Sequence, residues 1–349
     1  MKAQIRGSRN AVYYLAVAIS VLSVVLIAAG ALVTSTGSGD AIPDWPTSYG
    51  SLVPAQLAGG VLIEWIHRAI AGVLVLLVAT LTLLLALSDQ PKAVKILGAV
   101  VFFSVLAQAV LGGLRVLVVS NEKVQKATLT VFGLPEPEVG RIAFGVAHAI
   151  LAQIVLGFAV AIALLTKPHN RSQLQTKPSS TVVFISGLVV GLIVVQLIIG
   201  AIMRHTNSGL IISDFPTSFG KLFPPFGNLP FDAGNHGIMT YNEFAFRVAV
   251  NFAHRLNGFL IALAVVSLFC MVSRIPSLKE SPLHSLAMVQ LGLTLLQVFL
   301  GGLTVWSELS VPVTVAHVSI GAILMAISTL VFLLSLLPER SRLIGIKPE

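Results

Sequence analysis

The sequence predicts an all-α integral membrane protein with eight transmembrane helices, arranged as two parallel four-helix-bundle repeats. Of its 349 residues, 56% are hydrophobic and only 10% are charged, whereas soluble domains contain about 25% charged residues. Apolar stretches long enough to cross a bilayer occur repeatedly, and the second half of the chain resembles the first. We therefore expect an N-terminal repeat at 1–170 and a C-terminal repeat at 171–349.

Each expected helix is an apolar run that supplies the roughly 20 residues needed to span a bilayer. The runs lie at about 11–33, 61–87, 95–119, 142–165, 181–203, 244–272, 284–306 and 312–337. The first run resembles a signal peptide because basic residues precede it, but it is longer than a typical signal-peptide core. Its counterpart at 181–203 lies in mid-chain, so both are expected to be permanent spans.

The distribution of Lys and Arg predicts that both termini lie in the cytoplasm. Basic residues are retained on the cytoplasmic side, and the expected outer loop at 34–60 has none of the 22 in the chain. The net charge of +8 follows from this bias, and the basic residues are too dispersed for a nucleic-acid partner. The single cysteine, Cys270, excludes an intrachain disulfide and is expected to be a small packing residue.

The two halves share several motifs in the same order. The segment 36–50, which contains D-W-P-T-S-Y-G, returns as 206–220, which contains D-F-P-T-S-F-G. Further matches are His67-Arg68 with His254-Arg255, Gln108 to Leu114 with Gln297 to Leu303, and Ala147-His148 with Ala316-His317. Each repeat has an even number of spans, so the halves should relate by an axis along the membrane normal.

Four histidines are the candidate metal ligands: His67, His148, His254 and His317. All are expected at similar depth in the outer leaflet, two in each repeat. A lone membrane histidine often only bonds a neighbouring helix, but four at matched depth favour ligation. Two imidazoles in each half, with no cysteine, fit haem iron better than zinc, which usually takes three or four protein ligands.

Arg68 and Arg255 follow two of these histidines and are candidate cofactor-binding residues. Arginine binds carboxylates such as haem propionates with charge-assisted hydrogen bonds; the alternative is that both side chains extend to lipid headgroups. Arg115 and Arg204 align with Thr304 and Thr34, so their roles stay open. Gly112-Gly113 and Gly301-Gly302 allow close approach of a flat ring or, more simply, of a neighbouring helix.

Glu64 is the main difference between the halves. It precedes His67 by three residues and shares its helix face, whereas its counterpart is Asn251. A carboxylate kept in one half only predicts chemistry in that half, because a carboxylate at membrane depth suits proton transfer. The alternative is a structural ion pair between Glu64 and Arg68.

The remaining histidines are expected to lie outside the sites. His169 and His284 fall at the inner side and are expected to be solvated. His205 and His236 fall in outer segments, where surface positions are favoured over contact with a substrate edge.

The joined motifs resemble the haem A synthase family over about residues 11–337. They include Pro43-Asp44-Trp45-Pro46, Glu64-Trp65-Ile66-His67-Arg68, Leu111-Gly112-Gly113, Arg204-His205-Thr206, His254-Arg255 and Ala316-His317. The resemblance implies an oxidoreductase that converts a methyl group of haem O to a formyl group, with water favoured as the oxygen source. The product, haem A, serves haem–copper terminal oxidases, and the location that the resemblance implies is a bacterial plasma membrane.

The resemblance also implies a role for each site residue. The pair matching His254 and His317 would hold a prosthetic haem b, the pair matching His67 and His148 would address the substrate haem O, and Glu64 would be catalytic. Haem O synthase and an unidentified electron acceptor are the implied partners. Many bacterial members have a cysteine pair in outer loops, and this chain does not.

Two other functions compete with this interpretation. A dihaem b electron-transfer cytochrome would keep the histidines but gain nothing from Glu64. A transporter built from repeats would place its polar groups near the bilayer midplane, whereas these are expected nearer the outer surface.

Overall fold

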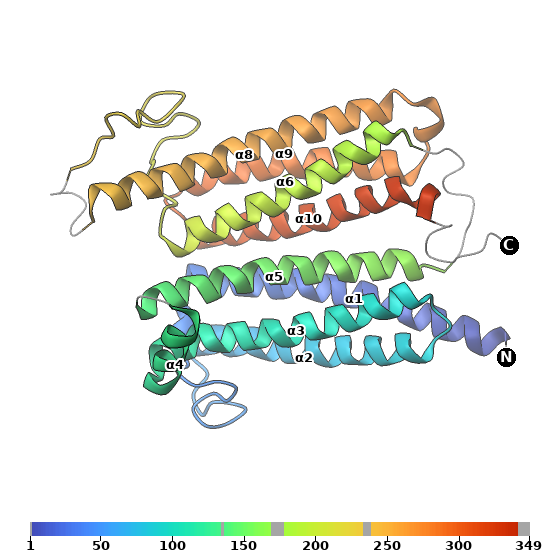
Figure 1. The fold of residues 1–349 in the computed structure, drawn as a ribbon, viewed down its shortest axis with the longest axis horizontal. Coiled ribbons are helices and arrows are strands. Elements are labelled where there is room, and N and C mark those ends of the chain that lie inside the picture. The colour runs from blue at the N-terminus through green and yellow to red at the C-terminus, as the bar shows by residue number, and fades with distance from the viewer. Residues whose placement is uncertain (1, 134–135, 169–177, 233–238, 341–349) are drawn as a thin grey trace.

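The computed structural model describes residues 2–133, 136–168, 178–232 and 239–340 (Figure 1). Eight long apolar helices in these ranges are able to cross a membrane. They are α1 (Lys2–Ser35), α2 (Gly59–Leu87), α3 (Lys92–Ser120), α5 (Pro137–Thr166), α6 (Ser180–His205), α8 (Tyr241–Ser273), α9 (Pro282–Trp306) and α10 (Val311–Arg340). The eight predicted spans are confirmed, and the protein is a multi-pass membrane protein.

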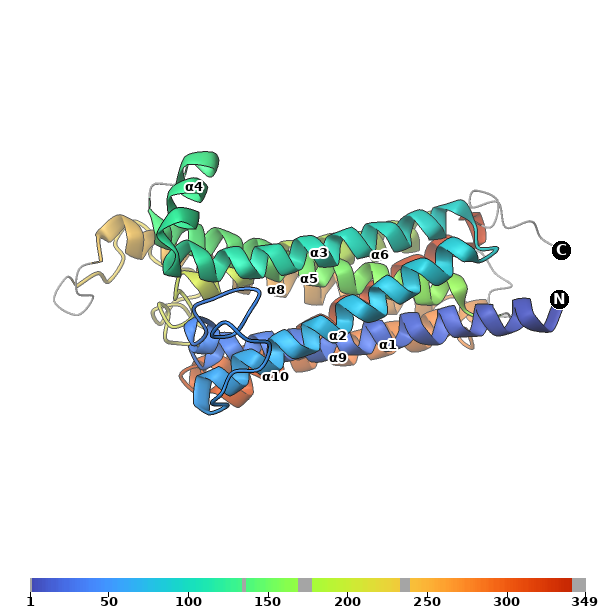
Figure 2. The ribbon, with the colours of Figure 1, turned by 90° about the horizontal axis from the view of Figure 1, so that it is seen from below.

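The helices pack in two groups of four. Helices α1, α2, α3 and α5 pack on one another, as do α6, α8, α9 and α10, and the groups meet where α1 and α5 contact α10 and α6 (Figures 1 and 2). The predicted boundary between 170 and 171 lies outside the described residues, so the division into repeats stays a prediction. The start of α1 and the end of α10 lie at the same end of the bundle (Figure 1).

The helix boundaries follow from local capping. The Ser179 hydroxyl accepts the N–H of Val182 at the start of α6, and Thr240 does the same for Glu243 at the start of α8. These side chains satisfy backbone N–H groups that have no partner inside the helix.

A short helix, α4 (Glu122–Phe132), was not expected from the sequence. Asn121 begins it by accepting the N–H groups of Lys123 and Val124, and Gly133 ends it in the left-handed region with a φ of 62°. Charged and polar residues alternate with apolar ones in this segment, so it does not form an apolar run. It lies at the end of the bundle opposite the start of α1 (Figure 2).

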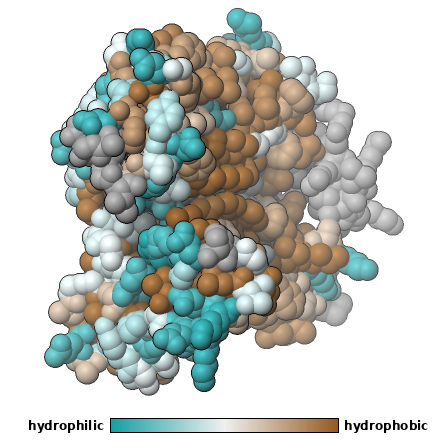
Figure 3. Space-filling model, turned by 60° about the vertical axis from the view of Figure 1, so that its left-hand side comes forward, coloured by the Kyte–Doolittle hydropathy of each residue, from teal (hydrophilic) through white to brown (hydrophobic). Residues whose placement is uncertain are grey.

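Large apolar side chains point both inward and outward, as expected in lipid. Val78, Leu81 and Leu85 of α2 are fully buried in the first group, whereas Phe103 and Phe259 are more than half exposed. A hydrophobic surface runs back along the bundle from a more hydrophilic end (Figure 3). Lipid covers such a surface at no cost in free energy, and the backbone groups are satisfied inside the helices.

Candidate functional site

The repeated loops at 44–50 and 214–220 are closed by an aspartate. The Asp44 carboxylate accepts the N–H of Tyr49 at 2.7 Å, the N–H of Gly50 at 2.9 Å and the Thr47 hydroxyl. Asp214 accepts the equivalent two N–H groups at 2.8 Å. Burial raises the pKa of Asp44, but hydrogen bonds from Gly50, Thr47 and Tyr49 outweigh it and lower the pKa from 3.8 to about 2.

Arg68 and Arg255 anchor these loops to α2 and α8. The Arg68 guanidinium donates to the carbonyls of residues 42, 44 and 47 at 2.8–3.1 Å, and to Glu64 at 2.6 Å. Arg255 donates to the carbonyls of residues 212, 214 and 217 at 2.7–2.9 Å. The Nε–H of each of these two guanidinium groups has no protein partner among the described residues. Binding of a propionate by Arg68 or Arg255 therefore stays a prediction.

Glu64 and Asn251 both hold a loop, but with opposite polarity. The buried Glu64 carboxylate accepts the N–H of Ile42 at 2.9 Å and the ion pair from Arg68. Asn251 instead donates to the carbonyls of Ser208 and Gly209 at 2.9 and 3.0 Å. The structure therefore contains the Glu64–Arg68 ion pair, which was the alternative to a catalytic role. At these two matched positions, only the first half has a buried acid.

The four candidate histidines come from α2, α5, α8 and α10, and a glycine of a neighbouring helix faces each ring. A Cβ atom added at Gly30 would lie 3.2 Å from His67, and one at Gly112 would lie 3.1 Å from His148. The matching distances are 3.1 Å from Gly200 to His254 and 3.3 Å from Gly301 to His317. Gly30 and Gly200 were not predicted as site residues from the sequence, although the offset of the matched loops (36 to 206) also relates these two glycines.

The rings of the second-half histidines lie close together. The ring centroids of His254 and His317 are 6.5 Å apart, close to the roughly 6 Å expected when two imidazole nitrogens each lie about 2 Å from one metal ion. Nδ1 of each is buried without a hydrogen-bond partner, and an orphaned buried nitrogen of this kind is costly unless it binds something. Gln196 donates to the His254 carbonyl at 3.0 Å and, with Gln297, lies beside the ring nitrogens.

The two first-half histidines differ from each other in the hydrogen bonds of their Nδ1 atoms. His148 Nδ1 lies 2.9 Å from the Gln108 carbonyl, and the Gln108 side chain donates to the His148 carbonyl at 2.8 Å. His67 Nδ1 is buried without a partner. The ring separation and the unpartnered nitrogens of the second half fit a haem held between paired imidazoles, whereas the pairing of His67 with His148 stays a prediction. No group of three or more metal-binding side chains occurs within the described ranges.

Three other predictions are corrected. His205 does not take the favoured surface position, because its ring packs against Gly145 of α5, where an added Cβ would lie 2.5 Å away. His284 is partly buried beside Ser273, at 3.2 Å, rather than fully solvated. Cys270 is exposed, so it is not a packing residue. His169 and His236 lie outside the described residues.

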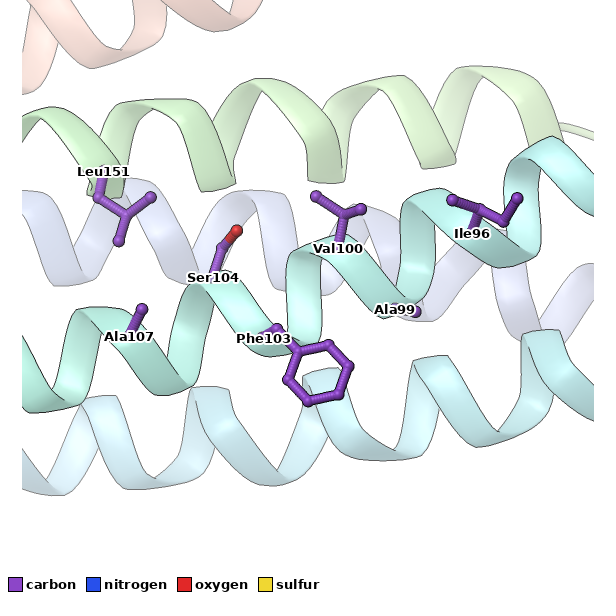
Figure 4. A pocket seen from close by; sticks show the side chains of 7 residues that line it. All are labelled: Ile96, Ala99, Val100, Phe103, Ser104, Ala107 and Leu151. Atoms are coloured by element: carbon purple, nitrogen blue, oxygen red, sulfur yellow. The ribbon is translucent and has the colours of Figure 1, made fainter.

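A shallow apolar groove lies apart from the paired rings. Six residues of α3 and Leu151 of α5 line it (Figure 4). None of the four candidate histidines contributes to its walls. It is a feature of the lipid-facing surface.

Comparisons with known proteins cover most of the chain. The sequence model of the COX15-CtaA family, described as a cytochrome oxidase assembly protein, matches residues 13–329. A protein named heme A synthase from Bacillus cereus strain 03BB102 is 27% identical over 310 residues, which cover 87% of this chain and 86% of that protein. Proteins of the same name from Lysinibacillus sphaericus and Shouchella clausii are 27% and 26% identical, over 60% and 69% of this chain and 62% and 69% of their own lengths.

Proposed function

This chain belongs to the COX15-CtaA family of cytochrome oxidase assembly proteins, and on that premise we propose that it is an oxidoreductase of haem A synthesis, which converts a methyl group of haem O to a formyl group. The names of its relatives support a role in haem A synthesis. The observation that carries the finer proposal is the difference between the two halves: both contain two candidate histidines, but Glu64 provides a buried carboxylate where the second half has Asn251.

We assign the prosthetic cofactor to the C-terminal half, residues 171–349. His254 and His317 would hold a haem b, with Arg255 beside it. A bound haem b would supply one-electron transfer. The chain contributes rigidity to this site, because Gln196 is itself held by Asn257, which donates to its Oε1 at 2.8 Å. Such outer hydrogen bonds orient the ligands of a metal.

We assign the substrate haem O to the N-terminal half, residues 1–170, between His67 and His148. Oxidation of a methyl group to an aldehyde with water as the oxygen source releases four protons and four electrons. Two successive hydroxylations give a geminal diol, which loses water to leave the formyl group. The electrons pass to an external acceptor.

We assign to Glu64 the transfer of protons from this site. Its carboxylate lies one helical turn from His67, and its two oxygens hold the N–H of Ile42 and the guanidinium of Arg68. Arg68 in turn holds the carbonyls of the loop at 42–47. Transfer of a proton to Glu64 would neutralise its carboxylate and leave the Arg68 guanidinium without a counter-charge. General base catalysis of this kind contributes about 100- to 10,000-fold.

The sites are assigned to the outer side of a bacterial plasma membrane, with both termini in the cytoplasm. Support comes from the position of the loops at 36–58 and 206–232, which lie at the end of the bundle opposite the start of α1 (Figure 1). The loop at 34–60 carries no basic residue.

The experiment compares histidine variants by mass spectrometry of extracted haems. His254→Ala should lose haem b, whereas His67→Ala should keep haem b and form no haem A. His284→Ala, which changes a partly buried histidine at the opposite end, is the control. Haem A formation by His67→Ala would refute the assignment of the substrate.

The alternative is a dihaem electron-transfer cytochrome, which the Glu64–Arg68 ion pair favours because it gives Glu64 a structural role. That protein would retain two haems of one type. It would form no haem A from added haem O.

A further inference from the structure

An arginine and a histidine, Arg115 and His205, lie on the outer side of His148. Arg115 of α3 is one turn beyond Gly112, which faces the His148 ring, and the His205 ring touches Gly145, one turn beyond His148 on α5. Arg115 lies within electrostatic range of His67, His148 and His205. Arg115 of α3 and His205 of α6 therefore lie on the same side of the first-half site.

Arg204 adds a partly buried cation to this group. Its guanidinium donates to the Ser35 hydroxyl at 2.8 Å, across the contact between α6 and α1. The described residues provide no carboxylate for it. A guanidinium that is removed from water with only a neutral partner is costly, so its position favours an anionic ligand.

The nearby carboxylates do not balance these charges. Asp40 lies 3.6 Å from both Arg115 and Arg141 and is half-exposed, and Glu138 is held by Arg141 through two hydrogen bonds. Arg115, Arg141 and Arg204 thus face only two carboxylates, and neither carboxylate pairs with Arg204.

The positions that match Arg115 and Arg204 in the opposite repeats hold neutral residues. Thr304 replaces Arg115 and donates to the Gly301 carbonyl of its own helix at 2.7 Å, and Thr34 replaces Arg204 and donates to the Gly30 carbonyl at 2.9 Å. The excess positive charge therefore belongs to one site of the two.

We infer that Arg115, Arg204 and His205 form a carboxylate-binding site for the propionate groups of the substrate haem. This inference rests on the proposed function, and it means that α6 of the C-terminal half completes the substrate site of the N-terminal half. Arg68 contributes little of this binding, because its four terminal N–H groups are already bonded to Glu64 and to the loop. A charge-assisted hydrogen bond to each carboxylate would fix the orientation of the ring in the site.

The test measures binding of haem O and of its dimethyl ester to the purified full-length protein in detergent, by the change in visible absorbance. Wild-type protein should bind the free acid at least tenfold more tightly than the ester. Arg204→Gln should weaken binding of the free acid about ten- to hundredfold and leave the ester unchanged, and Arg204→Lys should recover part of the loss. Arg247→Gln, which breaks a surface pair with Glu243, is the matched control.

Several outcomes separate this inference from the proposed function. Equal binding of acid and ester by the wild-type protein would overturn the carboxylate site, and it needs no variant to fold. Equal weakening of acid and ester by Arg204→Gln would also overturn it. Tight, acid-selective binding without haem A formation would refute the proposed conversion and leave the carboxylate site standing.

Discussion

Gly200 provides a sharp test of the second-half site, because a single methyl group added there meets the His254 ring. The Cβ of Gly200→Ala would lie 3.1 Å from Cε1 and 3.4 Å from Nδ1 of His254. Ordinary contacts begin at 3.4 Å, so the ring must move by a few tenths of an ångström. Gly191→Ala on the same helix is the control, since nothing lies within 4 Å of its Cβ.

The expected difference follows from two terms. Both substitutions gain up to about 1 kcal/mol from the better helical preference of alanine, so this gain cancels in the comparison. Overpacking against His254 costs about 1–3 kcal/mol. If displacement of the ring weakens haem ligation by that amount, the affinity for haem b falls about 5- to 150-fold.

The assay measures haem b per polypeptide after incubation with an excess of a haem-accepting apoprotein, together with the thermal unfolding temperature. Gly200→Ala should lose haem b, whereas Gly191→Ala should keep it and unfold at an equal or higher temperature. Equal haem retention by the two variants would refute the proposal that this glycine makes room for the His254 ring. The same design applies to the first half, where Gly30→Ala faces His67 at 3.2 Å and Gly72→Ala meets nothing; here haem b should stay and haem A formation should fall.

Three further predictions follow from the loops and the buried acid. Glu64→Gln should keep haem b and lower haem A formation by at least about 100-fold. The control Glu243→Gln, which removes a surface i,i+4 partner of Arg247, should leave haem A formation unchanged. Normal haem A formation by Glu64→Gln would support a purely structural ion pair. Because hydrogen bonds lower the pKa of Asp44 from 3.8 to about 2, the stabilisation of the loop at 44–50 by Asp44 should be complete above about pH 4 and lost as the pH falls towards 2. Hydrogen exchange of the Tyr49 and Gly50 amides measures this stabilisation. Loss of their protection already at pH 5 would contradict the prediction. Arg255→Lys should loosen the loop at 214–220, because one ammonium cannot reproduce the planar donor set that reaches three carbonyls; faster proteolysis of that loop than in the wild-type protein is the expected result.

The candidate histidines illustrate what local sequence can predict. Their depth is predicted from the length of each apolar run and their pairing from the repeated motifs, so the sequence alone names His67, His148, His254 and His317 as candidates. The same comparison identified the difference between Glu64 and Asn251. It did not identify their shared task, because the loop groups that they hold are 22, 42 and 43 residues away in the chain.

The sequence by itself determined the eight spans, the doubled loop and the residue types of the two sites, because hydrophobicity and chain length act locally along each helix. Only the tertiary structure decided which partners the polar groups take. Arg68 and Arg255 hold backbone carbonyls, Gly30 and Gly200 make room for histidine rings, and His205 crosses to Gly145. The physical reason is that the partner of a side chain in the membrane is set by which helix faces pack together, and residues far apart in the chain make those contacts.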